Sequence, residues 1–316
     1  MDYQQLIDQI KGFYITIPTM FRDPDLELDL DATRKVVEYI IENGMQTGNG
    51  VILAGGAAGD FSTMTFDERV AVTEAVADQA SGRIPVVMGA QTTSTRELIQ
   101  LAEAGKRVGA QYIQVSCPYY FPHTEQDFYE YVKAVSEAVD IGIVIYNTFW
   151  TSTSLSLDHA QRMIEFNNIV AIKWSSPRIF DLEFERMIMA YRNRLSIIDN
   201  QIRYIQSHMM GASAFECHTI NYWPQWGLNL LNLMNAGQYR EAQEEINRVV
   251  VPFYALWRHI EATHTSGDGY LDKLCIELVG LPSSRCRPPT RDVRDEYRTQ
   301  TRQMLEQCGA PVAPAQ

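Results

Sequence analysis

The sequence predicts a (β/α)8 barrel followed by a helical C-terminal region. Short runs rich in β-branched residues alternate with longer amphipathic stretches along the first 233 residues. Several of the short runs are apolar throughout, which is typical of parallel strands buried on both faces. Eight such runs, each followed by a helical stretch, match the strand and helix count of this barrel. A doubly wound open sheet is the alternative that the same alternation allows.

Each expected strand is a short apolar run, and the intervals between runs leave room for one helix and two loops. The eight runs are Phe13–Ile17, Val51–Ala54, Ile84–Gly89, Tyr112–Ser116, Ile141–Tyr146, Ile169–Lys173, Leu195–Asp199 and Ala212–Cys217.

Polar residues before the intervening stretches predict where helices begin. Thr65 and Glu68 have the spacing of a capping box, in which each side chain bonds to the other's backbone N–H. We expect these caps and helices: Asp31 for Ala32–Glu42, Thr65 for Phe66–Gln79, Thr93 or Ser94 for the stretch to Val108, Thr124 for Glu125–Ala138 and Ser156 for Leu157–Phe166.

Helical patterns beyond the barrel predict a C-terminal extension. We divide the chain into a barrel over residues 1–233, a helical region over 234–308 and a frayed tail over 309–316. The expected helices are Tyr239–His264, Leu271–Val279 and Asp292–Glu306, and Pro282–Pro289 is a turn rich in proline and arginine.

The composition excludes several classes of protein. With 46% hydrophobic and 21% charged residues, the 316-residue chain has the make-up of a soluble globular protein. Its net charge of −12 would repel a phosphate backbone, so we expect no nucleic-acid partner. The polar start Met1–Lys11 is unlike a signal peptide, and no run of about 18 apolar residues occurs, so we expect no membrane segment.

The cysteines and histidines indicate neither a disulfide scaffold nor a metal site. The five cysteines are odd in number, widely spaced and without a CxxC pair, which favours a reduced, cytoplasmic chain. The six histidines form no HExxH pattern. We therefore expect no bound metal.

Lys173 carries the clearest functional signal. Of six lysines it alone ends a β-like apolar run, and the reactive groups of a barrel lie at such strand ends. Burial there disfavours the ammonium form and lowers the pKa of the amine. A neutral amine can attack a carbonyl carbon and form a Schiff base. An ion-paired structural lysine is the alternative.

Other strand ends supply candidate partners. Tyr146 ends the preceding strand and could shuttle a proton during Schiff-base formation, or be a tyrosine at the edge of the core. The loop Gly55–Asp60 follows the second strand, and its N–H groups could hold an anion, although a plain tight turn is also compatible. Glu216 and His218 end the eighth strand, where an unpaired charge is costly to bury, so we expect them to shape the substrate end of the pocket.

Taken together, the motifs resemble those of the dihydrodipicolinate synthase / N-acetylneuraminate lyase superfamily, in the same order and over nearly the whole chain. The matching segments are Gly56–Asp60 with Met64, Thr65 and Glu68 (its GxxGE…LS/T…E signature), Gly109–Ala110, Pro118–Tyr120 (PYY), Ile145–Asn147 (Y-N), Ala171–Lys173 (I-K) and Arg287–Pro289.

The resemblance implies a Schiff-base enzyme that acts on a small 2-oxo acid such as pyruvate, without a metal or an organic cofactor, usually as a homotetramer. It implies that Lys173 forms the Schiff base and Tyr146 shuttles protons. The loop residues Gly56, Ala57, Ala58, Gly59 and Asp60 would hold the substrate carboxylate. Tyr120 would lie near a subunit contact, and we count it among the substrate-binding residues.

Departures from the family motifs bear on the substrate. Ala57 and Ala58 stand where synthases and sialic acid lyases carry hydroxyl residues, so a donor to the carboxylate and one member of the proton relay are missing. Thr151 stands about where the synthases carry an arginine, which argues against dihydrodipicolinate synthesis. Glu216 stands where the family usually has a small or apolar residue. These differences favour a bulky or aromatic second substrate.

Three functions are compatible with the sequence. The first is a Schiff-base aldolase or hydratase-aldolase acting on a 2-oxo acid. The second is a sugar-acid dehydratase that uses the same lysine, since that branch of the superfamily also lacks the relay hydroxyl. The third is a non-catalytic, ligand-binding barrel, which the two loop alanines favour and which the intact Lys173 and Tyr146 oppose.

Overall fold

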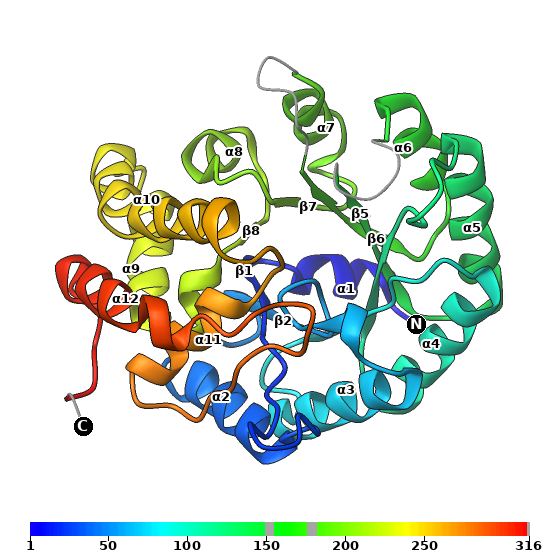
Figure 1. Cartoon of the computed structure of the whole chain (residues 1–316). Helices are drawn as coiled ribbons and strands as arrows, with labels where there is room; N and C mark the ends of the chain where they lie inside the picture. Colours follow the sequence, from blue (N-terminus) through cyan, green and yellow to red (C-terminus); the bar gives the residue numbers. More distant parts are fainter. Residues whose placement is uncertain (149–154, 176–181, 315–316) are drawn as a thin grey trace.

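The computed structural model describes residues 1–148, 155–175 and 182–314. Eight parallel strands form a closed barrel in which each strand pairs with the next and β8 pairs with β1 (Figure 1). The strands are β1 Gly12–Thr16, β2 Gly50–Ala54, β3 Val86–Gly89, β4 Tyr112–Ser116, β5 Gly142–Asn147, β6 Ile169–Trp174, β7 Ser196–Asp199 and β8 Ala214–Glu216. The predicted barrel is confirmed, and the alternative open sheet is wrong because the last strand pairs with the first.

Helices follow the strands and cover the outside of the barrel (Figure 1). They are α2 Leu30–Glu42, α3 Phe66–Ala80, α4 Thr95–Arg107, α5 Glu125–Ala138, α6 Leu157–Met163, α7 Glu183–Tyr191 and α8 Tyr204–Met210, with the 3-10 turns η1 Phe61–Thr63 and η2 His218–Asn221. Their buried apolar residues form one continuous core with the outward-facing residues of the strands.

Local capping explains where several of these helices begin. Thr65 and Glu68 form the predicted capping box at α3, and Ser94, Thr124 and Ser156 cap α4, α5 and α6. The prediction for α2 is wrong by two residues. The side chain of Asp29, not Asp31, accepts a hydrogen bond from the Ala32 N–H at 2.9 Å, so α2 begins at Leu30.

A helix that the sequence analysis missed closes the N-terminal end of the barrel. This helix, α1, spans Tyr3–Gln9 and is capped by Asp2. Leu6 belongs to the apolar cluster inside the barrel, together with strand residues such as Tyr112. The Tyr112 hydroxyl donates a hydrogen bond to the Leu6 carbonyl at 2.9 Å. The barrel interior is therefore filled and covered at this end.

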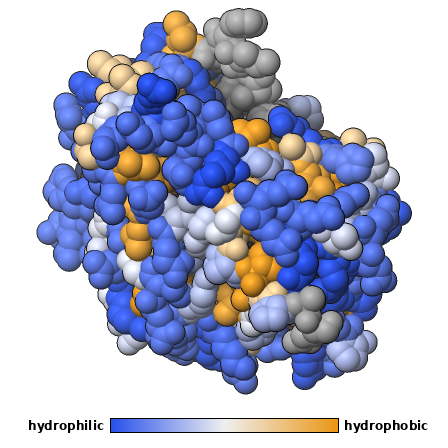
Figure 2. All heavy atoms as spheres, turned by 90° about the vertical axis from the view of Figure 1, so that its left-hand side faces the viewer, coloured by the Kyte–Doolittle hydropathy of each residue, from blue (hydrophilic) through white to orange (hydrophobic). Residues whose placement is uncertain are grey.

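Helix α9 Pro224–Asn235 follows β8 and η2 as the eighth helix of the barrel. Three helices come after it: α10 Tyr239–Thr263, α11 Tyr270–Leu278 and α12 Arg294–Cys308. They gather on the side of the barrel where β1 and β8 meet (Figure 1), and their outer face is largely hydrophilic (Figure 2). The tail lies against them as far as Ala313, whose N–H donates to the Leu278 carbonyl. None of the helices in the described ranges is long and apolar enough to cross a membrane.

Candidate active site

A cavity of about 1000 Å³ opens at the C-terminal ends of the strands. Six strands contribute a side chain to its wall: Thr16, Leu53, Gln114, Tyr146, Lys173 and Glu216. Residues of the C-terminal region, among them Trp257 of α10 and Asp268 of the α10–α11 loop, form another part of the wall. The cavity thus lies at the end of the barrel where this fold carries its reactive groups.

Lys173 is buried in this wall, with 4% of its surface exposed. Its Nζ lies 4.7 Å from the ring centroid of Tyr146 and 5.0 Å from that of Tyr14. Burial lowers the pKa of the amine, and the carboxylates of Glu216 and Asp268 oppose that shift. Within the described part of the chain no carboxylate forms an ion pair with Nζ, so burial remains the largest influence on the amine and keeps its pKa below the ordinary value.

Tyr146 lies directly opposite Lys173 in the pairing of β5 with β6. Its hydroxyl accepts a hydrogen bond from Asn200 Nδ2 at 3.2 Å. Burial raises the pKa of Tyr146 well above its ordinary value, while hydrogen bonding to Thr148 and Asn200 lowers it. The phenol is therefore protonated at neutral pH, which suits it to donate a proton to a group beside Lys173.

The glycine loop after β2 contributes two alanines to the cavity wall, and their backbone N–H groups are free. The Gly59 N–H donates to the Gly56 carbonyl at 3.0 Å, and the Asp60 N–H to the Ala57 carbonyl at 3.1 Å. By contrast, the N–H groups of Ala57 and Ala58 have no acceptor among the described residues, and both alanines line the cavity. Two adjacent free donors of this kind can hold a carboxylate.

Close packing explains the glycines of this loop. A Cβ atom on Gly56 would lie 2.6 Å from Leu53 Cδ2 and 2.7 Å from Thr16 Cγ2. A Cβ atom on Gly59 would lie 2.9 Å from the Gly56 nitrogen. A side chain at either position would therefore displace the turn that presents the two free N–H groups.

His218 lies in a buried cluster of charged groups beside the cavity. Its Nδ1 is 2.9 Å from both carboxylate oxygens of Asp272, and its Nε2 is 3.5 Å from Glu216 Oε1. The ring stacks on Phe253, with 5.6 Å between centroids. Burial lowers the pKa of His218, but Asp272 and Glu216 outweigh burial and raise it to about 10. His218 is thus a cation at neutral pH.

One group of side chains has the spacing of a metal site. The donor atoms of His218, Asp268 and Asp272 all lie within 4.8 Å of one another. However, His218 Nδ1 is already hydrogen-bonded to Asp272, and a protonated imidazole has no lone pair for a metal. In the described part of the chain this group is therefore better explained as an ion-pair cluster.

Two predicted binding residues lie away from the cavity wall. Asp60 is in the left-handed region, with φ 58°, and pairs with Lys273 at 2.7 Å. Tyr120 is 86% exposed and has φ 89°. The structure brings together Lys173, Tyr146, Ala57, Ala58, Glu216 and His218 in the wall, whereas Gly56 and Gly59 shape the loop behind it. Thr151 lies outside the described residues.

Sequence reasoning missed the part of the wall that the C-terminal region supplies. Tyr254 and Trp257 of α10 stack with 5.7 Å between centroids and 10° between planes, and both line the cavity. Asp268 lies in the loop Ser266–Gly269, which has no recognisable motif. The only available signal was that an acidic residue stands between two glycines just before a helical stretch.

Comparison with known proteins identifies relatives over the full length of the barrel and the C-terminal region. A model described as the dihydrodipicolinate synthetase family matches residues 10–308. The 4-hydroxy-tetrahydrodipicolinate synthase of Pelobacter propionicus is 35% identical over 275 residues, which cover 86% of this chain and 92% of the relative. The corresponding enzyme of Thermus thermophilus is 29% identical over 307 residues, covering 95% and 96%.

Solved structures show the same architecture. The dihydrodipicolinate synthase of Aquifex aeolicus superposes with a TM-score of 0.81 at 26% identity, covering 96% of this chain and 100% of that one. The chloride-inhibited dihydrodipicolinate synthase of Acinetobacter baumannii, solved in complex with pyruvate, also gives 0.81 at 26% identity, covering 95% and 99%.

Proposed function

The chain belongs to the dihydrodipicolinate synthetase family, and from that premise we propose that Lys173 forms a Schiff base with a 2-oxo acid of the pyruvate type. Membership of this family makes the protein a class I lyase. A catalytic barrel therefore explains the chain better than the non-catalytic, ligand-binding barrel. The observation that carries the proposal is the burial of Lys173 Nζ, without an ion-pair partner among the described residues, beside Tyr146 and two free N–H groups.

The chemistry follows from these positions. The substrate carboxylate accepts hydrogen bonds from the Ala57 and Ala58 N–H groups, which directs its keto carbon toward Lys173. The neutral amine adds to the keto carbon, and the resulting carbinolamine loses its hydroxyl as water when Tyr146 supplies a proton. The iminium that remains draws electrons from the neighbouring carbon, which allows a C–C bond there to form or break.

We also propose that the second substrate is bulky or aromatic. The cavity is large for a pyruvate-sized molecule alone, since pockets that hold whole drug-sized ligands measure about 300–1000 Å³. The stacked pair Tyr254 and Trp257 offers a flat apolar surface in the same cavity. An aldolase or hydratase-aldolase with an aromatic aldehyde as partner is therefore the function that the site supports best.

Borohydride reduction in the presence of pyruvate tests the Schiff base. The wild-type protein should gain one reduced pyruvate on the peptide that carries Lys173, located by mass spectrometry. Lys173→Ala should gain none, whereas Lys106→Ala, at a half-exposed position on α4, should label like the wild type. A label on another lysine, or no label with any 2-oxo acid, would overturn the proposal.

A second measurement separates the aldolase from the sugar-acid dehydratase. An aldolase exchanges the C3 protons of bound pyruvate with solvent, whereas a dehydratase specific for sugar acids need not. Exchange in deuterium oxide, followed by proton NMR, supports the aldolase. Labelling of Lys173 without exchange supports the dehydratase.

A further inference from the structure

Glu216 and His218 are two buried polar residues in the wall of the cavity that holds Lys173. Glu216 ends β8 and His218 begins η2, and they are 8% and 7% exposed. The 3.5 Å between Glu216 Oε1 and His218 Nε2 is longer than an ordinary N–H···O hydrogen bond of about 2.7–3.2 Å. The pair therefore places a donor and an acceptor side by side without a short hydrogen bond between them.

The His218 ring is held so that only Nε2 is left to bind a ligand. Its Nδ1 donates to both carboxylate oxygens of Asp272 at 2.9 Å, and Asn221 Nδ2 donates to the same carboxylate at 3.2 Å. Burial lowers the pKa of His218, but Asp272 and Glu216 outweigh burial and raise it, so Nε2 carries a hydrogen at neutral pH. The cavity wall therefore contains an oriented N–H donor.

The Glu216 carboxylate has no hydrogen-bond donor among the described residues, apart from its long ion pair with His218. Its backbone is fixed, because the Tyr204 hydroxyl donates to the Glu216 carbonyl at 2.6 Å and Tyr14 lies opposite Glu216 in the pairing of β1 with β8. A buried carboxylate that has lost water without gaining hydrogen bonds is costly. The carboxylate is therefore available to accept a hydrogen bond from a molecule in the cavity.

The pair favours a group that can accept and donate a hydrogen bond at once. An anion would be repelled by Glu216 and by Asp268 and Asp272, whose carboxylates surround His218, whereas an ammonium would meet the His218 cation. A carbonyl oxygen would bind to Nε2 but would leave Glu216 without a donor. A hydroxyl suits both, because its oxygen accepts from the Nε2–H while its hydrogen is donated to the carboxylate.

The pair adjoins the aromatic surface of the same cavity. The His218 ring lies edge to face with Trp257 and Tyr254, at 4.8 and 5.9 Å between centroids. Both aromatic residues line the cavity together with the pair. A ring of the second reactant that packs on Tyr254 and Trp257 therefore lies beside Glu216 and His218, where a hydroxyl substituent can reach them.

We propose that Glu216 and His218 determine specificity by binding a hydroxyl group of the second reactant. This role rests on the proposed function and narrows the second reactant to a hydroxylated aldehyde, which in the aromatic case is a hydroxybenzaldehyde. The hydroxyl donates to Glu216 and accepts from His218, and Asp272 orients the imidazole. The bond changes remain with Lys173 and Tyr146, so the pair acts through recognition of the substrate.

The substrate preference of the full-length protein tests this role. With pyruvate in excess, kcat/KM is measured for the ring isomers of hydroxybenzaldehyde and of fluorobenzaldehyde, because fluorine is of similar size to a hydroxyl but donates no hydrogen. The measured quantity is the ratio of kcat/KM for each hydroxyl isomer to that for its fluoro counterpart. The intrinsic reactivity of each aldehyde is the same for every protein, so it cancels when the ratios of two proteins are compared.

Glu216→Leu removes the acceptor and should lower the ratio for at least one isomer by about 10–100-fold, the range expected for a hydrogen bond to a charged group. Glu216→Gln keeps an oxygen that accepts from the hydroxyl, so the ratio should fall less, by about 3–10-fold. This variant also decides the question if Glu216→Leu does not fold. Glu261→Leu removes an exposed carboxylate of α10 from the same cavity and should keep the wild-type ratio.

A structural role for the pair would give a different result. Damage to the fold of the cavity lowers kcat/KM for the hydroxylated and fluorinated aldehydes alike and leaves their ratio unchanged. A ratio in both Glu216 variants that stays within about twofold of the wild type would therefore overturn the proposal. The same result is expected if a water molecule alone occupies the gap between Glu216 and His218.

A second set of aldehydes separates this proposal from the proposed function. Aliphatic aldehydes of two to five carbons are compared with and without a terminal hydroxyl. A preference for the hydroxyl that is lost in Glu216→Leu, without turnover of any benzaldehyde, would support the pair and overturn the aromatic partner. A wild type that labels at Lys173 with pyruvate and borohydride but accepts no hydroxylated aldehyde would overturn the pair alone. Absence of labelling in the wild type would overturn the Schiff base itself.

Discussion

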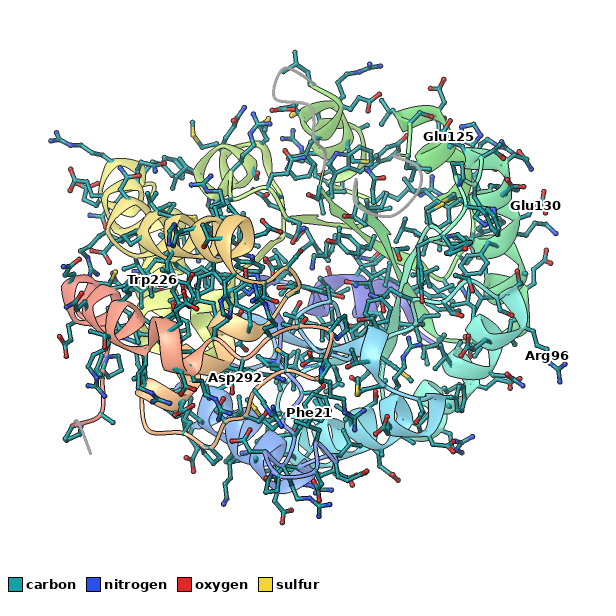
Figure 3. The ribbon with its side chains drawn as sticks, viewed as in Figure 1. Phe21, Arg96, Glu125, Glu130, Trp226 and Asp292 are labelled. Atoms are coloured by element: carbon teal, nitrogen blue, oxygen red, sulfur yellow. The ribbon has the colours of Figure 1, made fainter. Side chains whose placement is uncertain are left out.

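Asp60 and Lys273 form an ion pair, with 2.7 Å between Oδ2 and Nζ, that joins the glycine loop after β2 to α11. Both side chains are nearly inaccessible, at 6% and 1% exposed. Lys273 Nζ also lies 4.6 Å from the ring centroid of Phe21, which is labelled in Figure 3. Arg287 contacts the same ring and pairs with Glu68 at the start of α3. The C-terminal region thus fixes the loop that presents the Ala57 and Ala58 N–H groups.

Lys273→Met should strongly destabilise the fold, because it leaves the Asp60 carboxylate buried without its partner. Breaking a buried pair in this way costs about 3–5 kcal/mol in free energy of unfolding, measured by urea denaturation. Lys133→Met removes a more exposed pair with Glu137 on α5 and should cost at most about 0.5 kcal/mol. The double variant Asp60→Asn/Lys273→Met should recover much of the loss. Equal costs for Lys273→Met and Lys133→Met would contradict the structural role of the buried pair.

Lys173 should make the stability depend on pH. Burial lowers the pKa of the folded amine below its unfolded value of about 10.4. Between these two values the unfolded chain binds more protons, so the free energy of unfolding rises with pH. Lys173→Met removes the amine, so it should be more stable than the wild type at pH 7, and the difference should shrink toward pH 10. Urea unfolding at several pH values measures this difference in free energy of unfolding. A difference that stays constant with pH would show that Lys173 is not desolvated.

Tyr146→Phe should keep the fold and reduce turnover. One hydroxyl is lost with little change in volume, so the free energy of unfolding should fall by about 1 kcal/mol. Loss of the proton donor should slow Schiff-base formation by about 10²–10⁴-fold, measured as the rate of borohydride labelling with pyruvate. Tyr112→Phe removes a buried hydroxyl near α1, at the opposite end of the barrel, and should cost similar stability without slowing labelling. If both variants label at the wild-type rate, Tyr146 is not the proton donor.

His218 should remain protonated well above neutral pH. Although burial lowers its pKa, Asp272 and Glu216 raise it to about 10, against an ordinary value of about 6.5. A raised folded pKa contributes stability that is complete below about pH 6.5 and is lost as the pH approaches 10. His218→Gln should therefore destabilise the protein more at pH 6 than at pH 10. Imidazole nitrogen shifts in NMR should show a cation at pH 8, and Asp272→Asn should lower the pKa.

We expect a homotetramer in solution. Tyr120 and Phe121 are 86% and 63% exposed and lie edge to face, with 4.8 Å between centroids. Aromatic side chains exposed in this way are typical of a protein contact. Light scattering at micromolar concentration should give four times the 36.0 kDa chain mass. Tyr120→Asp should shift the mass toward smaller species, and a 36.0 kDa wild type would contradict the tetramer.

The barrel and its two central site residues could be predicted from the amino-acid sequence alone. Continuous apolar runs and local capping residues indicated the eight strands and most helix starts, because both signals depend on neighbours within a few positions. Lys173 and Tyr146 could be singled out because the end of a strand in this fold has a known position relative to the pocket. The α1 helix was missed because its short polar stretch becomes helical in contact with the barrel interior.

The surroundings of these two residues follow from long-range packing and could not be predicted from the sequence. Asp268 and Trp257 reach the cavity from elements that follow the barrel, and no local pattern links them to Lys173. Asp60 belongs to the predicted carboxylate-binding loop, yet it has a left-handed backbone and its side chain bonds to Lys273 and does not line the cavity. Such placements depend on contacts between residues as much as 213 positions apart. They are set by the packing of the C-terminal helices on the barrel, which periodicity and capping in the sequence do not encode.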